Sequence, residues 1–321
     1  MRAMVTGGAG FIGSNLVDAL VADGAEVTVL DDLSTGRRAN LAGALAAGAR
    51  LCEASVADPA AVREAFGVAR PEVVFHLAAQ IDVRRSVADP AFDALVNVEG
   101  TLAVLEAARL AGSRRVVYVS TGGAIYGEAP IFPTPEDAPV APLAPYGQSK
   151  FAAEGYCSLY ARLHGLSTVT LRLANVYGPR QDPLGEGGVV AIFCGRLLTG
   201  ERATIYGDGR QTRDYVYVGD VVDAALLAAG AAGTEPLNVG SGTETTVVEL
   251  AAAMRGLGAG GFETAHAPER PGEVRRSCLD PDRAAGVIGW RPRTSLADGL
   301  RGTLAWQRDE VSQAAAAEPT A

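Results

Sequence analysis

The sequence predicts an α/β fold in which a doubly wound parallel sheet is followed by a smaller, mixed α/β C-terminal lobe. Two observations carry this prediction. Short β-branched runs alternate with alanine-rich stretches of helical length, and this alternation stops near residue 174. Such alternation places parallel strands beneath helices on both faces. Right-handed crossovers then put a ligand crevice at the carboxyl ends of the strands.

Residues 1–174 are predicted to form the domain that contains the parallel sheet. Apolar, β-branched runs of strand length occur at 3–7, 26–31, 49–54, 72–78, 115–120 and 168–173. Helical patterns lie between them at about 13–23, 59–67, 91–111 and 145–165. We therefore expect each strand to be joined to the next by a crossover that covers one face of the sheet.

Residues 175–311 are predicted to form the smaller lobe over the mouth of the sheet, with some of its segments returning to the first domain. Its mixed pattern predicts helices at 188–199, 219–230 and 246–257, and strands at 203–207 and 214–218. The final stretch, 312–321, is rich in alanine and lacks a buried pattern, so we expect a flexible tail.

Charge and composition exclude several classes of protein. The chain has 321 residues with 28 Lys and Arg against 37 Asp and Glu, and a net charge of -9 does not favour a nucleic-acid partner. No apolar run is long enough to span a membrane, and no signal-type stretch precedes the first strand. We therefore expect a cytoplasmic protein. The four cysteines are far apart, and their spacing predicts no metal site.

Glycines at the first strand–helix junction predict a dinucleotide-binding site. The stretch TGGAGFIG (6–13) places Gly7, Gly10 and Gly13 between a strand and a helix. Glycine permits the tight turn and lets the backbone approach a pyrophosphate. The free N–H groups and the positive end of the following helix favour the phosphates. A plain structural turn is the alternative for a glycine motif taken alone.

The end of the second predicted strand indicates which dinucleotide binds. Asp31 stands there, where a carboxylate accepts hydrogen bonds from ribose hydroxyls and repels a 2′-phosphate. This favours NAD as the cofactor. Arg37 and Arg38 follow closely, and they keep NADP open as an alternative.

The only lysine of the chain, Lys150, follows Tyr146 by four residues, so both face the same way on the helix predicted at 145–165. A free phenol has a pKa near 10 and is a poor base at neutral pH. An ammonium about 5 Å away, at an effective dielectric constant of about 20, would favour the phenolate by about 3 kcal/mol. The pair therefore predicts a tyrosine that acts as acid and base. Chance recurrence of the spacing is the alternative for the pair taken alone.

Five motifs together resemble the extended short-chain dehydrogenase/reductase superfamily: TGGAGFIG, HLAAQ (76–80), VSTGGAIYG (119–127), YGQSK (146–150) and LRLANVYGPR (171–180). Within it, the chain is most similar to the NAD-dependent UDP-glucose (UDP-galactose) 4-epimerases, from residue 1 to about 310. The resemblance implies a Rossmann domain that binds NAD and a C-terminal lobe that binds a UDP-sugar. It also implies a homodimer formed through the helices at 91–111 and 145–165.

The activity implied by this resemblance is an isomerisation. A hydride leaves C4 of the hexose for NAD, Tyr146 takes the hydroxyl proton, and the 4-keto sugar turns over before it receives the hydride on its other face. The cofactor-binding residues implied are Gly7, Gly10, Phe11, Ile12, Gly13, Asp31, Asp58, Tyr146 and Lys150. His76 ends a strand nearby, and we expect it to pack beside the cofactor rather than to take part in catalysis.

Four substrate-binding residues are implied by the same resemblance. Arg213 and Arg270 match positions that hold the diphosphate, and an arginine fork suits phosphate oxygens. Asn175 matches a polar contact to the substrate. Ser277 aligns with a position that lines the hexose pocket, where a small residue leaves space for an N-acetyl group. UDP-GlcNAc and UDP-GalNAc are therefore expected as further substrates. Ordinary ion pairs are the alternative for the arginines, and a cap or turn for Asn175.

The chain departs from the family at one catalytic position. Gly122 stands where the family has a serine that is hydrogen-bonded to the reacting hydroxyl, and Gly123 follows it. Glycine has no side chain to donate or accept, so another group must act. Thr121 is the nearest hydroxyl, and we expect it to be the third catalytic residue. A hydroxyl bonded to the backbone is the alternative.

Three other activities are compatible with a dinucleotide-binding fold, and they differ in the residues they need. Nucleotide-sugar 4,6-dehydratases carry Thr-Asp-Glu where this chain has Thr-Gly-Gly, so dehydration does not fit. A UDP-glucuronate 4-epimerase or decarboxylase stays open and would need a cation for the substrate carboxylate, for which Arg84, Arg85 or Arg180 could serve. A non-enzymatic NAD-binding regulator would have no reason to keep both Tyr146 and Lys150.

Overall fold

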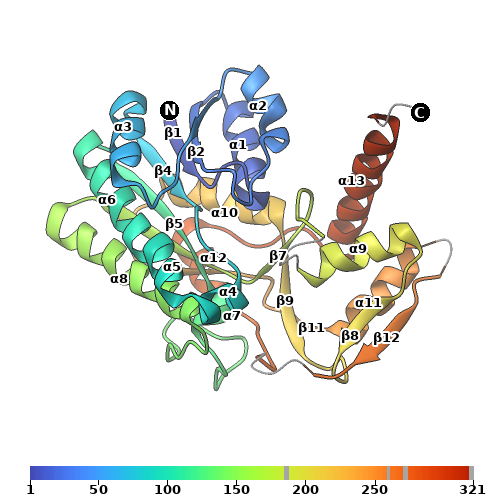
Figure 1. The fold of residues 1–321 in the computed structure, drawn as a ribbon. Helices are drawn as coiled ribbons and strands as arrows, with labels where there is room; N and C mark the ends of the chain where they lie inside the picture. The colour runs from blue at the N-terminus through green and yellow to red at the C-terminus, as the bar shows by residue number, and fades with distance from the viewer. Residues whose placement is uncertain (184–187, 259–260, 270–273, 318–321) are drawn as a thin grey trace.

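The computed structural model describes residues 1–183, 188–258, 261–269 and 274–317. Two lobes lie side by side, the larger built mostly from the first half of the chain and the smaller from the second (Figure 1). The α/β class predicted from the sequence is confirmed. Arg270 lies outside the described residues, so the structure does not place it.

A seven-stranded sheet forms the centre of the larger lobe, with the order β10-β6-β5-β4-β1-β2-β3 and every pair parallel. Its strands are β1 (Arg2–Thr6), β2 (Glu26–Asp31), β3 (Arg50–Glu53), β4 (Val73–His76), β5 (Arg115–Thr121), β6 (Ser167–Leu173) and β10 (Leu237–Val239). The chain runs outward from β1 through β2 to β3, then returns to β4 on the other side of β1. This reversal makes the point between β1 and β4 the place where an open sheet binds a ligand.

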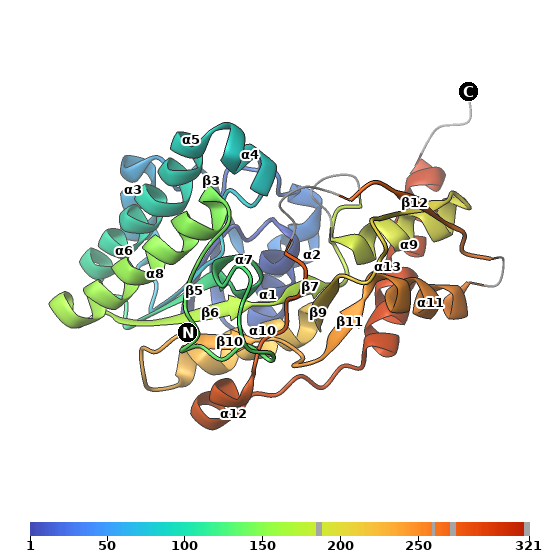
Figure 2. The ribbon, with the colours of Figure 1, turned by 90° about the horizontal axis from the view of Figure 1, so that it is seen from below.

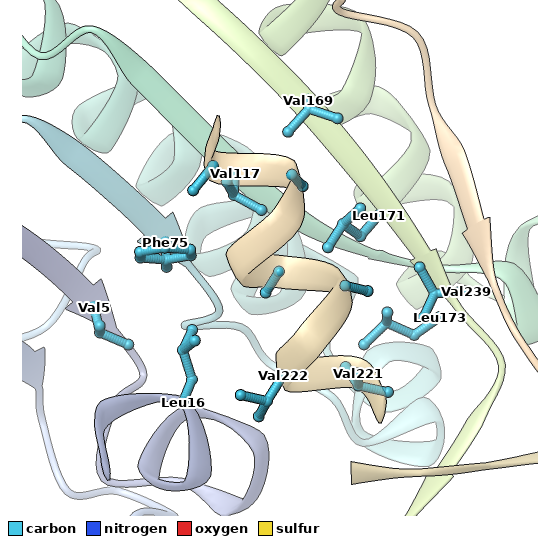
Figure 3. Packing of buried hydrophobic residues seen from close by; sticks show 14 of the residues in the cluster. Val5, Leu16, Phe75, Val117, Val169, Leu171, Leu173, Val221, Val222 and Val239 are labelled. Carbon is cyan, nitrogen blue, oxygen red and sulfur yellow. The ribbon is translucent and has the colours of Figure 1, made fainter. Parts of the chain in front are cut away.

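Helices cover both faces of this sheet, as the alternating pattern predicted. Those of this lobe and its edges are α1 (Phe11–Ala22), η1 (Arg38–Leu41), α2 (Ala42–Ala46), α3 (Pro59–Ala69), α4 (Val83–Ala88), α5 (Pro90–Ala94), α6 (Gly100–Ala111), α7 (Gly122–Ile125), α8 (Pro145–His164), α10 (Val218–Gly230) and α12 (Asp282–Ile288). Because side chains alternate along a strand, Val5, Phe75 and Val117 point toward α1 and α10 (Figure 3). Their neighbours Met4 and Val74 pack with α3, α6 and α8 on the other face.

One predicted helix is interrupted. The stretch expected as a single helix at 91–111 consists of α5, a π-helical turn η2 (Leu95–Glu99) and α6. Such turns are frequent at functional sites. Here the turn contains Asn97, whose side-chain amide donates to Asp93 and Ser149 and whose carbonyl oxygen accepts from the backbone of Gln80.

The smaller lobe has its own sheets and core. Its elements are β7 (Asn175–Tyr177), α9 (Val189–Thr199), β8 (Ala203–Tyr206), β9 (Thr212–Tyr217), β11 (Glu244–Thr246), α11 (Val247–Leu257), β12 (Thr264–Ala267) and α13 (Leu296–Ala317). Figure 2 shows α9, α11 and α13 gathered beside these strands. Phe193, Met254, Phe262 and Leu300 are buried between them.

Three segments of the second half pack on the first sheet. β10 pairs with β6 at its edge, α10 covers one face, and α12 lies against β10. α13 continues to Ala317, past residue 312, where the sequence predicted a tail to begin. None of the described helices is both long enough and apolar enough to cross a lipid bilayer.

Candidate active site

A cavity of about 830 Å³ opens at the carboxyl ends of the parallel strands, where the strand order reverses. It is lined by residues from both halves of the chain. Those predicted from the sequence are Gly7, Gly10, Phe11, Ile12, Gly13, Asp31, Thr121, Tyr146 and Lys150. The structure therefore brings the glycine turn at 7–13 and the pair formed by Tyr146 and Lys150 to one cavity.

Two positions near the junction of β1 and α1 have room only for glycine. Gly7 has φ +69°, and a Cβ there would lie 2.6 Å from the backbone nitrogen of Ala78. A Cβ at Gly13 would lie 2.1 Å from the carbonyl oxygen of Gly7. Within the described residues no side chain caps α1 at Gly10, so the start of the helix is left to the cavity. This cradle fits a dinucleotide pyrophosphate, because close backbone approach and free N–H groups are what that group needs.

Asp31 is held in one orientation at the end of β2. Its Oδ2 accepts from the N–H of Ala9 at 2.8 Å, and its Oδ1 accepts from the N–H of Leu33 at 2.9 Å. Burial raises the pKa of this carboxyl, although both backbone hydrogen bonds act in the opposite direction. Each carboxylate oxygen has a second lone pair, so the group can still accept from ribose hydroxyls.

The two arginines that kept NADP open are both engaged with carboxylates. Arg37 forms an ion pair with Asp182 at 3.2 Å, and Arg38 forms one with Glu53. These contacts favour NAD. Asp58 differs from the other predicted cofactor residues. It is exposed, does not line the cavity, and caps α3 by accepting from the backbone of Ala60 and Ala61.

The reactive pair lies at the start of α8, which begins with Pro145 in its first turn, where the missing N–H costs nothing. Tyr146 is partly exposed to the cavity, and its side chain is hydrogen-bonded to Thr121. Lys150 is buried, with its Nζ 4.4 Å from the centroid of the Tyr118 ring. The hydroxyl that the sequence analysis chose to replace the family's serine thus contacts the phenol.

The electrostatic expectation for Tyr146 was wrong for the protein alone. Burial raises the pKa of Tyr146 to about 12, which outweighs the hydrogen bond from Thr121, and Asp93 raises it further. Burial also lowers the pKa of Lys150 to about 8. The attraction of the ammonium is outweighed by the loss of solvation, which penalises both charged forms. Tyr146 is therefore a neutral phenol until further positive charge enters the cavity.

His76 is a structural neighbour of this pair. Its Nδ1 is 2.6 Å from the Thr6 hydroxyl, and its Nε2 is 3.0 Å from that of Thr101. Burial, and then the charge of Lys150, lower its pKa to about 3, so the ring stays neutral. With both nitrogens engaged in hydrogen bonds, His76 packs behind the site and moves no proton.

The predicted substrate residues are only partly brought together. A Cβ at Gly123 would lie 3.8 Å from Asn175 Oδ1 and 4.0 Å from both Ser277 Oγ and Thr121 Oγ1. These three side chains therefore surround the place that Gly123 leaves open. Asn175 Oδ1 is buried and has no hydrogen-bond partner among the residues that the structure describes. Arg213 lies on β9, where its guanidinium donates to the Thr212 carbonyl at 2.8 Å.

At Gly122, where the family has a serine, a side chain would contact Leu279. A Cβ there would lie 2.4 Å from Cδ1 of Leu279, which is buried. A serine side chain does not fit unless Leu279 moves. Thr121, the preceding residue, is the one whose side chain contacts Tyr146.

Other parts of the cavity wall were not assigned to the cofactor site by the sequence analysis. They include Gln80 and Arg85 near α4, and Arg180, Gln181 and Asp182 after β7. Arg85 lies over the ring of Phe92, with 3.9 Å between its guanidinium carbon and the ring centroid. In the described part of the chain no group of His, Cys, Asp and Glu side chains is arranged to hold a metal ion.

A buried ion pair that was not predicted fastens α8 to the sheet. Glu154, one turn beyond Lys150, forms an ion pair with Arg172 of β6 at 2.7 Å, and their side chains are only 7% and 5% exposed. Ser120 of β5 donates to Glu154 at 2.5 Å. Arg172 also donates to the Tyr126 hydroxyl at 2.8 Å. These contacts set the position of the helix that carries Tyr146 and Lys150.

A comparison with protein-family models finds that residues 3–240 match the NAD dependent epimerase/dehydratase family. The chain belongs to this family. It is 51% identical over 312 residues to a Mycolicibacterium smegmatis protein named UDP-glucose 4-epimerase, a match that covers 97% of this chain and 99% of that protein. The resemblance inferred from the five motifs is confirmed.

Solved structures agree with this assignment. A UDP-glucose 4-epimerase of Thermotoga maritima with UDP-glucose superposes with a TM-score of 0.94 at 46% identity, covering 97% of this chain and 100% of that one. A UDP-glucose 4-epimerase of Thermus thermophilus in complex with NAD superposes with a TM-score of 0.90 at 45% identity, covering 96% and 99%. Both alignments include the two lobes, so the likeness extends beyond the dinucleotide-binding sheet.

Replacing Glu154 by glutamine should destabilise the fold. The buried guanidinium of Arg172 would lose its counter-charge, and breaking a buried pair costs about 3–5 kcal/mol. Chemical denaturation measures this loss as a lower midpoint. The control is Glu263→Gln, which removes the partner of exposed Arg202 and should cost at most about 1 kcal/mol. Equal midpoints for the two variants would contradict the role given to Glu154.

Proposed function

We propose that the protein is an NAD-dependent 4-epimerase of UDP-hexoses, an isomerase that interconverts UDP-glucose and UDP-galactose. The observation that carries the proposal is the Thr121–Tyr146–Lys150 cluster in the same cavity as the glycine turn and Asp31. Relatives named UDP-glucose 4-epimerase, which match almost the whole chain, support it.

The described residues fit NAD as the resident cofactor. We assign the phosphates to the turn formed by Gly7, Gly10, Phe11, Ile12 and Gly13, because its cradle and helix start suit an anion. The other assigned residues are Asp31 for the adenosine ribose, and Lys150 and Tyr146 beside the nicotinamide ribose. Asp58, which caps α3 outside the cavity, is not assigned a contact. When bound, NAD takes a hydride from C4 of the sugar and later returns it.

The protein's own residues handle the proton. Tyr146 accepts the proton of the C4 hydroxyl as the carbon becomes a ketone, and it returns that proton when the hydroxyl is restored. Thr121 donates to the phenolic oxygen and so favours the phenolate, and Lys150 adds a positive charge. Because burial holds the pKa of Tyr146 near 12, the tyrosine accepts a proton only when more positive charge lies beside it.

The diphosphate of the substrate must be bound firmly, while the hexose must be free to turn over. We propose that Arg213 and Arg270 hold the diphosphate, since an arginine fork suits phosphate oxygens. At the sugar end, Gly123 leaves space between Asn175 and Ser277, so a keto sugar can present either face. In this proposal residues 1–174 are the NAD-binding domain, and residues 175–311 are the nucleotide-sugar-binding lobe.

Replacing Tyr146 by phenylalanine should abolish epimerisation and leave NAD bound. Loss of the proton acceptor is expected to lower turnover by about 10²–10⁴-fold. NMR of the products follows inversion at C4 of UDP-glucose, and acid release of the nucleotide measures bound NAD. For the wild type we expect UDP-galactose without net NADH or CO2. Release of CO2 from UDP-glucuronate, with no epimerisation of UDP-glucose, would overturn the proposal.

Ser277 is proposed to set the breadth of substrates. Its side chain is small and buried, and it faces the space beside Gly123, so an N-acetyl group can be accommodated. Ser277→Tyr should therefore lower activity on UDP-GlcNAc much more than on UDP-glucose, by tenfold or more (about 1.4 kcal/mol). Ser277→Ala is the control and should keep the ratio. A ratio that tyrosine leaves unchanged would remove Ser277 from specificity.

We propose a homodimer formed through α8 and the α5–α6 region, as the family resemblance implies. Exposed apolar side chains on these helices support it: Leu95, Leu110, Phe151, Tyr156, Leu159 and Leu163. The double variant Leu159→Glu, Leu163→Glu should be a monomer in sedimentation, while Leu227→Glu on α10 should leave the dimer intact. A wild-type monomer at micromolar concentration would contradict this assembly.

A further inference from the structure

The segment Gly178–Asp182 (178–182) follows β7 and forms one wall of the cavity that holds the glycine turn. Arg180, Gln181 and Asp182 all line that cavity. The segment comes from the second half of the chain, yet it lies against the first helix of the larger lobe. It therefore joins the two halves of the chain at the wall of the proposed cofactor site.

Three contacts tie this segment to the first 37 residues. Asn15 of α1 donates to the Pro179 carbonyl at 3.1 Å, and Arg180 Nη2 donates to Asp18 at 2.5 Å. On the other side, Arg37 pairs with Asp182 at 3.2 Å. The segment is thus anchored at both of its ends, and the guanidinium of Arg180 is held between them.

Arg180 shows two signs of a ligand-binding residue. Its Nη1 is buried and has no hydrogen-bond partner among the described residues, although Nη2 is bonded to Asp18. Its backbone has φ +72°, in the left-handed region that residues with a side chain rarely adopt. Such a conformation costs on the order of 1–3 kcal/mol and persists mainly where the surroundings hold a functional group in place.

The groups at this part of the cavity wall favour an anionic ligand. A buried guanidinium nitrogen without a partner among the described residues needs an acceptor, and a bound anion can supply one. The same cavity contains the start of α1, whose N–H groups and dipole also favour an anion. An arginine fork and a helix N-terminus together suit a phosphate, and each would bind a different oxygen.

We propose that Arg180 binds a phosphate oxygen of the dinucleotide through Nη1. In this proposal Asp18 orients the guanidinium, and the 178–182 segment holds Arg180 at the wall of the cavity. This inference rests on the proposed cofactor site but not on the sugar chemistry. If the inference holds, Arg180 is not the cation for the carboxylate of UDP-glucuronate, a role for which the sequence left it open.

The test measures competition against labelled NAD by rapid filtration, with ADP or adenosine as the competitor, and the direct binding of labelled UDP to the NAD-loaded protein. Arg180→Gln should weaken the binding of ADP by about 10–100-fold, as expected for a lost charge-assisted hydrogen bond, and should change the binding of adenosine by less than about twofold. UDP should bind the variant as well as it binds the wild type if the phosphate belongs to the cofactor. The purified variant should also exchange its bound NAD for labelled NAD faster than the wild type.

Two further variants keep the test decisive. Arg202→Gln removes an exposed arginine that pairs with Glu263 in the smaller lobe. This variant should bind ADP, adenosine and UDP with the affinities of the wild type. Arg180→Lys cannot bond Asp18 and a phosphate together, so it should also weaken the binding of ADP. Because it keeps the positive charge, its loss of affinity should be smaller than that of Arg180→Gln.

The outcomes separate two failures. If the wild type itself bound no labelled NAD, the proposed cofactor site would be wrong. If the wild type bound NAD but Arg180→Gln left the affinity for ADP unchanged, or lowered the affinities for ADP and adenosine equally, the role of the 178–182 segment would be only structural. A selective loss for UDP would assign Arg180 to the substrate diphosphate and overturn the inference.

Discussion

The ion pair between Glu154 and Arg172 decides where α8 lies on the sheet, and the position of α8 decides where Tyr146 and Lys150 face. A buried pair of this kind adds little net stability, because both charges lose their hydration. It does select one arrangement, since any displacement of α8 would leave two buried charges unpaired. Ser120 extends the same contact to β5, next to the threonine that touches the phenol.

Burial drives the ionisable groups around this helix toward their neutral forms. The pKa of Tyr146 rises to about 12, that of Lys150 falls to about 8, and that of His76 falls to about 3. The desolvation that causes these shifts acts on every ionisable group in the site, so any charge that a ligand adds there will change all three pKa values.

The sequence predicted the large sheet well because its strands are long enough to show a pattern. β10 and β7 have only three residues each, and their pairing with β6 and β9 depends on distant parts of the chain. The π-helical turn was not predicted, because the apolar spacing of 91–111 also suits an unbroken helix. Local spacing carries no information about an extra residue in one turn.

Within the site, residue types that belong to one motif could be predicted, while contacts between distant segments could not. The glycines, Asp31, Tyr146 and Lys150 are recognisable by spacing. The exclusion of a side chain at Gly122 depends on Leu279, more than 150 residues away. The rise in the pKa of Tyr146 in the protein alone was not predicted, because burial is a property of the folded chain.

The contacts of the 178–182 segment have a consequence for assembly. Asn15 and Asp18 meet their partners across 164 and 162 positions of sequence. A chain that ended at β6 would therefore have the glycine turn and Asp31 but not this wall of the cavity. The nine or so residues that follow β6 are enough to supply its contacts with α1, before the helices of the smaller lobe begin.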